Sequence, residues 1–513
     1  GDIPLIAGGV EASLRRFAHY DYWSDRLRRS ILIDSGADLL VYGMGEKPVR
    51  EIALLLDRGV PVKDIQSVRG TVYKTASIPE GVGAVELPSW EEVSSGRREF
   101  ARAFRLQYNE QDPFHGRPAA QKSGGLWAVQ NPPPMPLSTE EMDRIYSYPY
   151  TRTWHPMYKK WGGVPAIEEV RFSLTSHRGC FGSCSFCAIH YHQGRIIQAR
   201  SHDSLLAEAR ILTSLPDFKG YIHDVGGPTA NFRIPSCDEQ LLRGACRGKQ
   251  CLHPAACRKL NADHSDYIAL LRKLRALRGV KKVFIRSGIR FDYLMEDKKN
   301  SFLEELCEFH VSGQLKIAPE HVSPRVLAAM GKSRPEVYMK FMEAYARMNK
   351  KLGKRQYLVP YFISSHPGAE LEDAVLLAEF LRDTGHRPEQ VQDFIPTPGS
   401  LSTCIYYSGI HPFTGKEVYV PLSTEERGMQ RALLQYDVPK NRETVIKALV
   451  AAGREDLIGD GPLCLVKPSA RPSAAGKSSR PGGGARSSPR QEKGRRRPSG
   501  GKGRPRSGGR RKK

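Results

Sequence analysis

Six apolar runs of strand length alternate with helical segments between residues 168 and 400. The segments between the runs place apolar residues at spacings of three and four, which is typical of helices that cover a sheet. This βα alternation predicts parallel strands with helices outside, arranged as an open sheet or as a partial or full barrel. In either arrangement the chemistry lies beyond the carboxyl ends of the strands. The predicted strands are 170–176, 221–227, 282–289, 314–320, 357–365 and 391–399.

The remaining chain divides by composition. Residues 1–90 contain short apolar runs that end in glycine and one helical segment, which favours part of an α/β domain. Residues 91–167 include a proline cluster and are predicted to be a linker with some helix. Residues 401–466 are predicted to be a mixed C-terminal extension. Because the first residues already resemble a strand entering a glycine turn, we expect an incomplete N-terminus.

Most of the formal charge of +24 belongs to a C-terminal tail, residues 467–513. The tail holds 17 Lys and Arg against the single Glu492. It has almost no apolar residues, so nothing there offsets the entropy of ordering, and we expect disorder. Without aromatic residues it can attract nucleic acid only through phosphate, non-specifically. The alternative is a solvated extension with no specific partner.

Cysteine usage and hydropathy indicate the compartment. No stretch approaches the roughly 18 to 20 apolar residues that a membrane-spanning helix needs. The ten cysteines are clustered and no secretory signal is visible. Clustered cysteines of this kind indicate metal or cluster ligands in a reducing compartment. We therefore expect a cytoplasmic protein with no membrane association.

Three cysteines, Cys180, Cys184 and Cys187, follow the first predicted strand with C-x3-C-x2-C spacing. Iron-sulfur clusters are normally held by four thiolates, so three at short range leave one iron of a four-iron cluster without a protein ligand. An iron with open coordination can bind a chelate such as the amino and carboxylate groups of S-adenosylmethionine (SAM).

Two other residues of this loop, Gly182 and Phe186, have predicted roles. We expect Gly182 to give it backbone angles that other residues avoid, and Phe186 to shield a cluster from water. The alternative is a structural zinc site of three cysteines with His177 or His190. Zinc sites of that type seldom lie at the catalytic end of a βα repeat.

This motif, on a loop after the first strand of a six-fold βα series, resembles the radical SAM superfamily. The resemblance implies a partial (β/α)6 barrel of the TIM type and a [4Fe-4S] cluster. It also implies a reducing electron donor and cleavage of SAM to methionine and a 5'-deoxyadenosyl radical that abstracts hydrogen from a substrate. The cofactor supplies such chemistry and the protein positions it.

SAM contacts are expected at the ends of the later strands. Gly226 and Gly227, in "DVGGPTANF", occupy the place of a Gly-Gly-Glu motif whose backbone receives the SAM amino group in radical SAM enzymes. Pro228 replaces the glutamate, so that side-chain contact is lost, and a simple turn is the alternative. Strand ends also offer Ser287, Arg290 and Glu320, which are expected either to bind the SAM carboxylate and ribose or to take ordinary surface and salt-bridge roles.

Residues 1 to about 465 resemble the YgiQ family of radical SAM proteins. The match includes "GGVEASLRRFAHYDYWSD", "ADLLVYGMGE", "HRGCFGSCSFCAIHYHQGR", "CRKLNADHSDY", "KIAPEHVSPRVLAAMGK" and "PYFISSHPGAELEDA". It implies that the N-terminal α/β portion is the remainder of a cobalamin-binding-like, Rossmann-like domain. Cobalamin itself does not follow, because the histidine that ligates cobalt in such domains would lie upstream of Gly1.

A second cysteine group lies in the long insertion between the second and third predicted strands. With two nearby histidines it could hold a zinc ion or an auxiliary cluster, or it could be a set of free thiols. Cys307 falls on an apolar helical face and is expected in the core, whereas Cys404 and Cys464 receive no role. The group and its neighbours are Cys237, Cys246, Cys251, Cys257, His253 and His264.

These features support an enzyme with radical SAM chemistry on an unidentified substrate, with no catalytic residue assigned. An RNA-modifying radical SAM protein is the second hypothesis, suggested by the tail and by the similarity of "ISSHPGAELEDA" and "PTPGS" to methylthiotransferase-like barrels. The third is a non-catalytic protein that binds zinc and nucleic acid.

Overall fold

The computed structural model describes residues 3–299 and 301–468, and Gly1–Pro468 form one compact unit. Residues 469–513, on which most of the predicted tail falls, lie outside the described residues. None of the described helices combines the length and the apolar character required to cross a bilayer.

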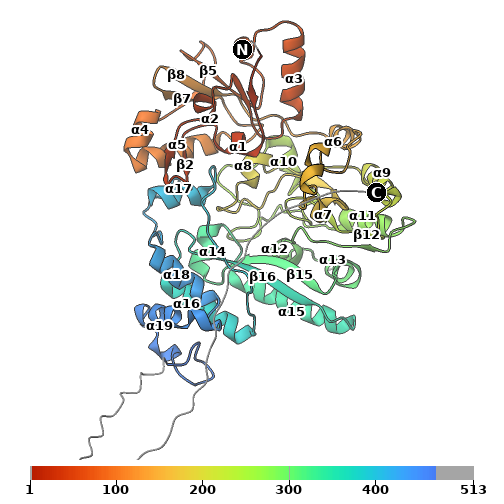
Figure 1. The fold of residues 1–513 in the computed structure, drawn as a ribbon, viewed down its shortest axis with the longest axis vertical. Helices are drawn as coiled ribbons and strands as arrows, with labels where there is room; N and C mark the ends of the chain where they lie inside the picture. Colours follow the sequence, from red (N-terminus) through yellow and green to blue (C-terminus); the bar gives the residue numbers. More distant parts are fainter. Residues whose placement is uncertain (1–2, 300, 469–513) are drawn as a thin grey trace, which may run out of the picture. The chain divides into compact units, whose positions relative to one another are not determined.

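The N-terminal part is built on a six-stranded sheet in the order β1-β4-β5-β8-β7-β6. Figure 1 labels β5, β7 and β8 of this sheet. The pairs β1-β4 and β6-β7 are parallel, whereas β4, β5, β8 and β7 pair in antiparallel fashion. The sheet is therefore mixed and differs from the expected Rossmann-like arrangement, in which the strands run parallel. Its strands are β1 (Ile6–Ala7), β4 (Leu39–Val41), β5 (Thr71–Thr75), β6 (Val85–Leu87), β7 (Ala119–Ser123) and β8 (Leu126–Gln130).

Two of these strands come from residues 91–167, so the predicted linker is wrong for that part of the chain. β7 and β8 form a hairpin whose two-residue turn begins at Gly124, with a φ of +60°. Such turns favour left-handed backbone, which glycine adopts readily. The buried apolar residues of β7 are Ala119 and Ala120, and Gln121 and Ser123 are buried beside them. Small side chains give a weak apolar signal, which explains why the strand was missed.

Helices cover both faces of this sheet because its side chains alternate. Leu39 and Val41 pack with Ile52 of α3 (Glu46–Asp57), whereas Leu40 packs with Ala12 and Leu32 on the opposite face. Successive residues of a strand point to opposite faces, so a short strand such as β4 supplies both cores. The other helices here are α1 (Gly9–Leu14), α2 (Ile31–Asp34), α4 (Trp90–Ser95) and α5 (Arg97–Asn109), and β2 (His19–Asp21) pairs with β3 (Arg26–Arg28).

The structure has a strand in each of the six ranges predicted between residues 168 and 400. β9 pairs with β13, β12 with β14, Ile289 with Ile317, β15 with β16 and β16 with β17, and every one of these pairings is parallel. Strands that are neighbours in space are therefore also neighbours along the chain, and their order does not reverse. The strands are β9 (Ser173–Thr175), β12 (Tyr221–Ile222), β13 (Asp224–Gly226), β14 (Lys282–Val283), β15 (Gln314–Glu320), β16 (Tyr357–Ser364) and β17 (Gln392–Asp393).

Helices alternate with these strands and bury one apolar face. In α9, Leu205, Ala209 and Leu212 are buried at helical spacing, and Ser201 caps the helix by accepting a hydrogen bond from the backbone N–H of Ser204. The alternating helices are α9 (His202–Ser214), α11 (Ser265–Arg275), α13 (Ser301–Glu305) with a π-helical turn at Leu306–His310, α15 (Pro335–Lys351) and α16 (Leu371–Thr384).

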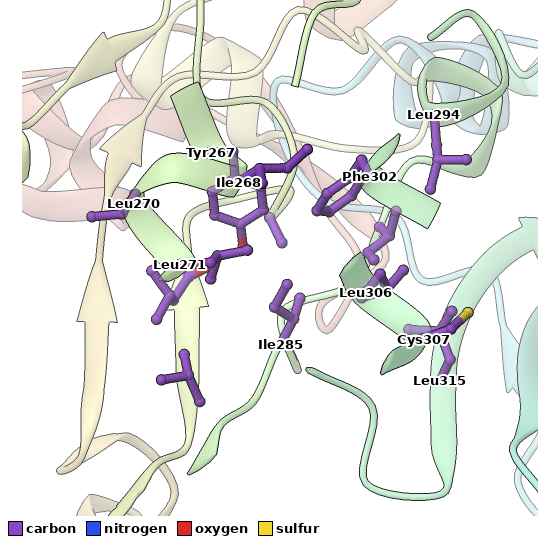
Figure 2. Packing of buried hydrophobic residues seen from close by; sticks show 14 of the residues in the cluster. Tyr267, Ile268, Leu270, Leu271, Ile285, Leu294, Phe302, Leu306, Cys307 and Leu315 are labelled. Carbon is purple, nitrogen blue, oxygen red and sulfur yellow. The ribbon is translucent and has the colours of Figure 1, made fainter. Parts of the chain in front are cut away.

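The main core lies between these strands and helices (Figure 2). Leu270 and Leu271 of α11 are fully buried beside Leu306 and Leu315. Cys307 belongs to the same cluster and has no exposed surface, which confirms its predicted place in the core.

The segment after residue 400 is helical. Helices α18 and α19 pack together with α16 around Leu433, Val445 and Leu449, and Val466 pairs with Ile458 in a parallel bridge. The elements are α17 (Leu401–Ser408), α18 (Thr424–Leu434) and α19 (Arg442–Ala451). Shorter elements near the site are α6 (Thr139–Tyr146), α7 (Ile167–Val170), β10 (His177–Arg178), α8 (Ile189–Gln193), β11 (Gln198–Ala199), α10 (Asp238–Arg243), α12 (Phe291–Met295) and α14 (Pro324–Met330).

Candidate functional site

The three cysteines of the C-x3-C-x2-C motif lie on a loop between β10 and α8, directly after the first strand of the parallel series. Other segments hold this loop by backbone atoms. The Ser185 N–H donates to the Met330 carbonyl at 2.9 Å, and the Ser185 carbonyl accepts from the Ser402 N–H at 2.9 Å. The Gln250 side chain, from the long insertion, donates to the Ser183 carbonyl at 2.9 Å. The loop is thus fixed from three directions.

Aromatic packing anchors the loop beside Cys180. Phe181 is fully buried and stacks on Phe232 with ring centroids 3.7 Å apart, while Tyr293 meets both rings edge-on. Phe186 packs instead on the Val326, Met330 and Ala369 cluster.

Gly182 is required for space, which differs from the predicted reason. Its backbone is not left-handed; that conformation occurs at Gly179 and Ser183, with φ of +87° and +50°. A Cβ on Gly182 would lie 2.4 Å from Nη1 of Arg290 and 3.4 Å from Sγ of Cys180. The missing side chain therefore admits the Arg290 guanidinium to the cysteine loop.

Arg290 is held by a buried carboxylate. Its Nε and Nη2 donate to Asp292 at 2.8 and 2.6 Å, and its Nη1 donates to Sγ of Cys184 at 3.4 Å. Burial opposes ionisation of Asp292, but the Arg290 charge outweighs it and lowers the pKa of that carboxyl. Arg290 was expected to bind the carboxylate or ribose of SAM. The structure places it at the cysteine loop, where it offers a charge-assisted donor to a thiolate.

The thiols themselves are close enough to interact. Burial and the neighbouring Cys184 raise the pKa of Cys180, and the same two causes raise the pKa of Cys187 to about 12. Without a metal these two groups stay protonated at neutral pH, whereas cluster ligation requires thiolates.

The histidines of the zinc alternative are engaged elsewhere. Nε2 of His177 lies 3.0 Å from the Thr229 carbonyl, and Nε2 of His190 lies 2.9 Å from the Tyr108 hydroxyl. Residues 3–299 and 301–468 contain no group of three or more His, Cys, Asp or Glu side chains arranged to hold a single metal ion. The thiolates of a four-iron cluster bind different iron atoms and need not converge on one point.

We expect Asp292→Asn to be strongly destabilising, because it leaves the Arg290 charge buried without its partner. Breaking a buried ion pair in this way costs about 3–5 kcal/mol. Urea unfolding midpoints of the anaerobic protein measure the effect. Glu343→Gln, which removes one partner of the exposed Arg347–Glu343 pair, is the matched control and should leave the midpoint unchanged. Equal midpoints for the two variants would contradict the stabilising role of the buried pair.

A cavity of about 880 Å³ opens beside the Gly226-Gly227 turn, and Gly226, Gly227 and Ser287 line it. A Cβ on Gly226 would lie 2.2 Å from Oγ of Ser287, and one on Gly227 would lie 2.6 Å from the His177 carbonyl oxygen. Both glycines are therefore required by close approach. Oγ of Ser287 is buried and has no hydrogen-bond partner in the described chain.

The cavity is polar and spans several strands. Its volume falls within the roughly 300–1,000 Å³ of small-molecule sites. Oδ1 of Asp224 accepts from the backbone N–H groups of Arg286 and Ser287 at 2.7 and 3.1 Å, which fixes the third strand against the second. The polar side chains that line the cavity include Ser173, Thr175, His177, Arg178, Asp224, Arg286, Gln314 and Lys316.

Glu320 does not line this cavity. It ends β15 in a left-handed conformation with φ of +70°, and its carboxylate lies 3.8 Å from the Lys332 ammonium. Lys332 also donates to the Ala318 carbonyl at 2.7 Å. Burial raises the pKa of Glu320. Non-glycine residues in this conformation carry strain and cluster at functional sites, and Ser183 and Ser365 share it.

The second cysteine group is not gathered around a metal position in the described residues. His253 contacts the Lys332 carbonyl at 2.8 Å, and His264 stacks on Phe302 with centroids 4.7 Å apart. Nδ1 of His264 lies 2.9 Å from the Ala262 carbonyl and its Nε2 lies 3.1 Å from the Asn231 side-chain amide, so both ring nitrogens are engaged. For His253 the contact involves Nδ1. A second metal or cluster at the four cysteines stays a prediction.

Sequence reasoning missed Asp292 and Lys332. Asp292 lies two residues after Arg290 in "RFD", and Lys332 follows the "APEH" strand end by a short helix. The available signal for Asp292 was that an acidic residue stands two positions after Arg290. Nothing in the spacing indicated that Lys332 would reach back to β15.

The chain matches three family models. These are the Radical SAM N-terminal domain at residues 1–173, the Radical SAM superfamily at 174–381, and a domain of unknown function (DUF3362) at 389–512. The last range extends beyond the described residues.

Two clostridial proteins are close relatives. A UPF0313 protein of Clostridium botulinum (strain 657 / Type Ba4) is 57% identical over 465 residues, which cover 91% of this chain and 73% of that protein. A UPF0313 protein of Clostridium perfringens (strain 13 / Type A) is 56% identical over 467 residues, covering 91% and 70%.

Solved structures are more distant. TsrM from Kitasatospora setae, a radical SAM methyltransferase, has a TM-score of 0.39 at 14% identity over 78% of this chain and 57% of its own. OxsB, a cobalamin-dependent radical enzyme, has a TM-score of 0.42 at 14% identity over 77% and 41%. No conclusion follows from similarity at this level.

The clostridial relatives and the matched models, by contrast, confirm the resemblance found in the sequence: the chain belongs to the UPF0313, or YgiQ-like, family of radical SAM proteins.

Proposed function

We propose that this chain uses a [4Fe-4S] cluster, held by Cys180, Cys184 and Cys187, to cleave SAM reductively and act on a substrate in the adjoining cavity. The observation that supports this most is the pairing register of the parallel strands β9 and β13. Gly226 pairs with Thr175, and the Ser176 N–H donates to the Gly226 carbonyl at 2.7 Å. The cysteine loop and the Gly-Gly turn thus leave the same end of two paired parallel strands, where α/β enzymes place their chemistry.

The chain's own residues fit a cluster with one open coordination position. Three thiols share one loop, and Arg290 supplies a donor beside Cys184. Hydrogen bonds to cluster sulfurs are one of the means by which proteins adjust reduction potential. When bound, such a cluster supplies the electron that cleaves SAM and yields a 5'-deoxyadenosyl radical.

The cavity fits the SAM part of the proposal. The unpartnered hydroxyl of Ser287 faces Gly226, and a buried polar group without a partner is costly unless a ligand satisfies it. We assign Ser287 and the Gly226-Gly227 backbone to SAM binding. Arg290 and Glu320, which do not line the cavity, would act through the cysteine loop instead.

Strand order supports a barrel of the radical SAM type. In a doubly wound open sheet the order reverses at a switch point. Here each strand pairs with the next in the chain, from β9 to β17, without reversal. We therefore propose a partial (β/α)6 barrel rather than an open sheet. Cytoplasmic location and a separate electron donor remain part of the proposal, and cobalamin is not assigned.

Ser287→Ala is expected to raise the KM for SAM roughly tenfold or more, since hydrogen bonds to charged groups contribute about 1.5–3 kcal/mol. The assay is anaerobic, with reconstituted protein, dithionite and SAM, and 5'-deoxyadenosine is measured by chromatography. Ser123→Ala is the matched control, because Ser123 in β7 is also a buried hydroxyl without a partner. An absence of 5'-deoxyadenosine with wild-type protein would refute the proposed function. An unchanged KM in Ser287→Ala would refute only the assignment of Ser287.

A further inference from the structure

Residues 147–166, here named the aromatic strap, connect α6 to α7 (Figure 1) and expose large apolar side chains. Exposed fractions are 52% for Tyr148, 52% for Tyr150, 39% for Tyr158 and 62% for Trp161. Isolated exposed apolar residues need no explanation, but several in one short segment mark an interaction surface.

The strap has its own internal and anchoring contacts. Trp154 packs against Gly163, where a Cβ would lie 2.7 Å from the indole ring. The Tyr150 hydroxyl donates to the Ile145 carbonyl at 2.9 Å, and Arg152 pairs with Glu208 of α9. These contacts hold Trp154, Tyr150 and Arg152 in place, and the rings of Tyr158 and Trp161 lie beside each other with centroids 6.1 Å apart. A segment that is ordered before a partner binds lowers the entropic cost of binding.

The charge of the strap has one sign. Residues 147–167 contain no Asp or Glu, whereas Lys159 and Lys160 lie next to Trp161. The Lys160 ammonium is 4.1 Å from the centre of the Trp161 ring. Neither lysine forms an ion pair with any residue of the described chain, whereas Arg152 is engaged with Glu208. Aromatic faces beside free cations are the two components of single-strand nucleic-acid sites.

The strap also borders the cavity. Tyr146, directly before it, and Glu169 and Val170, in α7 directly after it, line the 880 Å³ cavity beside the Gly-Gly turn. The strap is therefore flanked in the chain, on both sides, by residues that line the proposed substrate cavity.

We propose that the aromatic strap binds single-stranded RNA, with bases stacked on Tyr158 and Trp161 and phosphates near Lys159 and Lys160. Two lysines without an ion-pair partner in the described chain, in a segment with no carboxylate between residues 147 and 167, are complementary to phosphate. The nearest following carboxylates, Glu168 and Glu169, belong to α7. Unstacked bases on aromatic side chains are the usual mode of recognition for RNA loops and single strands. Only the further step, that this RNA is the substrate, rests on the proposed function.

The test uses the full chain and a fluorescein-labelled 15-nucleotide RNA of mixed sequence. Tyr158→Ala/Trp161→Ala should weaken binding by about tenfold or more, because each stacked base contributes at least a few-fold in affinity. Tyr158→Phe/Trp161→Phe should retain affinity, since phenylalanine still stacks. Lys159→Gln/Lys160→Gln should reduce the slope of log affinity against log salt by about two.

Controls separate the strap from the basic tail, which is present in every variant. Trp23→Ala removes an aromatic residue that is 83% exposed and lies between β2 and β3, and it should leave binding unchanged. Cross-linking with 4-thiouridine RNA should map to residues 147–166. Cross-links confined to 469–513, with equal affinity of the alanine variant and the wild type, would overturn the proposal. Equal affinity for the matching DNA strand would overturn the choice of RNA.

SAM cleavage is measured separately without RNA. If cleavage fails while RNA binding persists, the proposed function is refuted and the strap is not. If cleavage persists while the strap variants bind RNA like the wild type, only the strap proposal is refuted.

Discussion

Replacing Cys180, Cys184 and Cys187 together by alanine is expected to abolish the broad visible absorption of the reconstituted protein and to reduce SAM cleavage below detection. The three thiols share one loop, and the histidines of the zinc alternative, His177 and His190, contact Thr229 and Tyr108. No neighbouring side chain is therefore placed to replace three thiolates. Iron and acid-labile sulfide per chain, together with the absorption spectrum and 5'-deoxyadenosine formation, measure the outcome.

The control for this experiment is Cys464→Ser, which alters a partly exposed cysteine that contacts the Asp456 carbonyl oxygen. It should retain the absorption and the SAM cleavage of the wild type. Wild-type iron content in the triple variant would place the cluster elsewhere, with the second cysteine group as the first candidate. Zinc without iron or sulfide in the wild type would favour the third hypothesis, a non-catalytic protein.

A second large effect is expected from acid. Burial lowers the pKa of His177, His190 and His366 to about 3 and that of His321 to about 4. These imidazoles stay neutral in the folded protein, whereas in the unfolded chain they take up protons below about pH 6.5. Stability should thus be constant above about pH 6.5 and fall as the pH decreases toward 4.

The size of this loss follows from the pKa shifts. One lowered histidine costs about 1.4 kcal/mol for each pH unit below 6.5, or about 2 kcal/mol at pH 5. Four such groups cost about 8 kcal/mol, which is comparable to the whole stability of a typical domain. Between pH 4.5 and 6.5 most carboxyls remain ionised, so this window isolates the histidines.

Guanidinium unfolding midpoints of the metal-free protein at pH 7, 6 and 5 measure the loss. His366→Asn should reduce the pH dependence by about one proton, even if its midpoint at pH 7 is lower. His155→Asn changes an exposed histidine before the 3-10 turn of the strap and should keep the full dependence. Midpoints that do not change between pH 7 and 5 would contradict the expectation.

The sequence predicted the parallel half of the fold well, because its strands carry strong patterns. Runs such as "QLKIAPE" and "YLVPYFISS" combine apolar residues with turn signals on both sides, and both are strands in the structure. The N-terminal sheet was harder. Its strands β7 and β8 lie far along the chain from β4 and β5 and are partly built from alanine, and pairing over such separations leaves no local pattern.

Some residues of the candidate site could be predicted from the sequence, and others could not. The three cysteines stand out as candidates because they lie within eight positions of the chain, and Gly226 and Gly227 stand out because they end a predicted strand. The only sequence signal for the partner of Arg290 was an acidic residue close to it in the chain, since the contacts around Cys184 depend on which side chains are buried together. The same limit applies to Lys332, whose reach to Ala318 and Glu320 depends on how α14 folds back.

The arrangement of Gly182, Arg290 and Asp292 constrains the order in which this family can change. Any side chain at position 182 would occupy the space of the guanidinium, and loss of either charge leaves the other buried alone. These positions should therefore covary among relatives, with all three retained or all three altered. A lineage that abandons the pair can do so only through an unstable intermediate, or after replacement of both charges by apolar residues. Position 182 can accept alanine only after the Arg290 guanidinium has been replaced. A glycine retained at position 182 in a relative therefore indicates that the arginine is retained too.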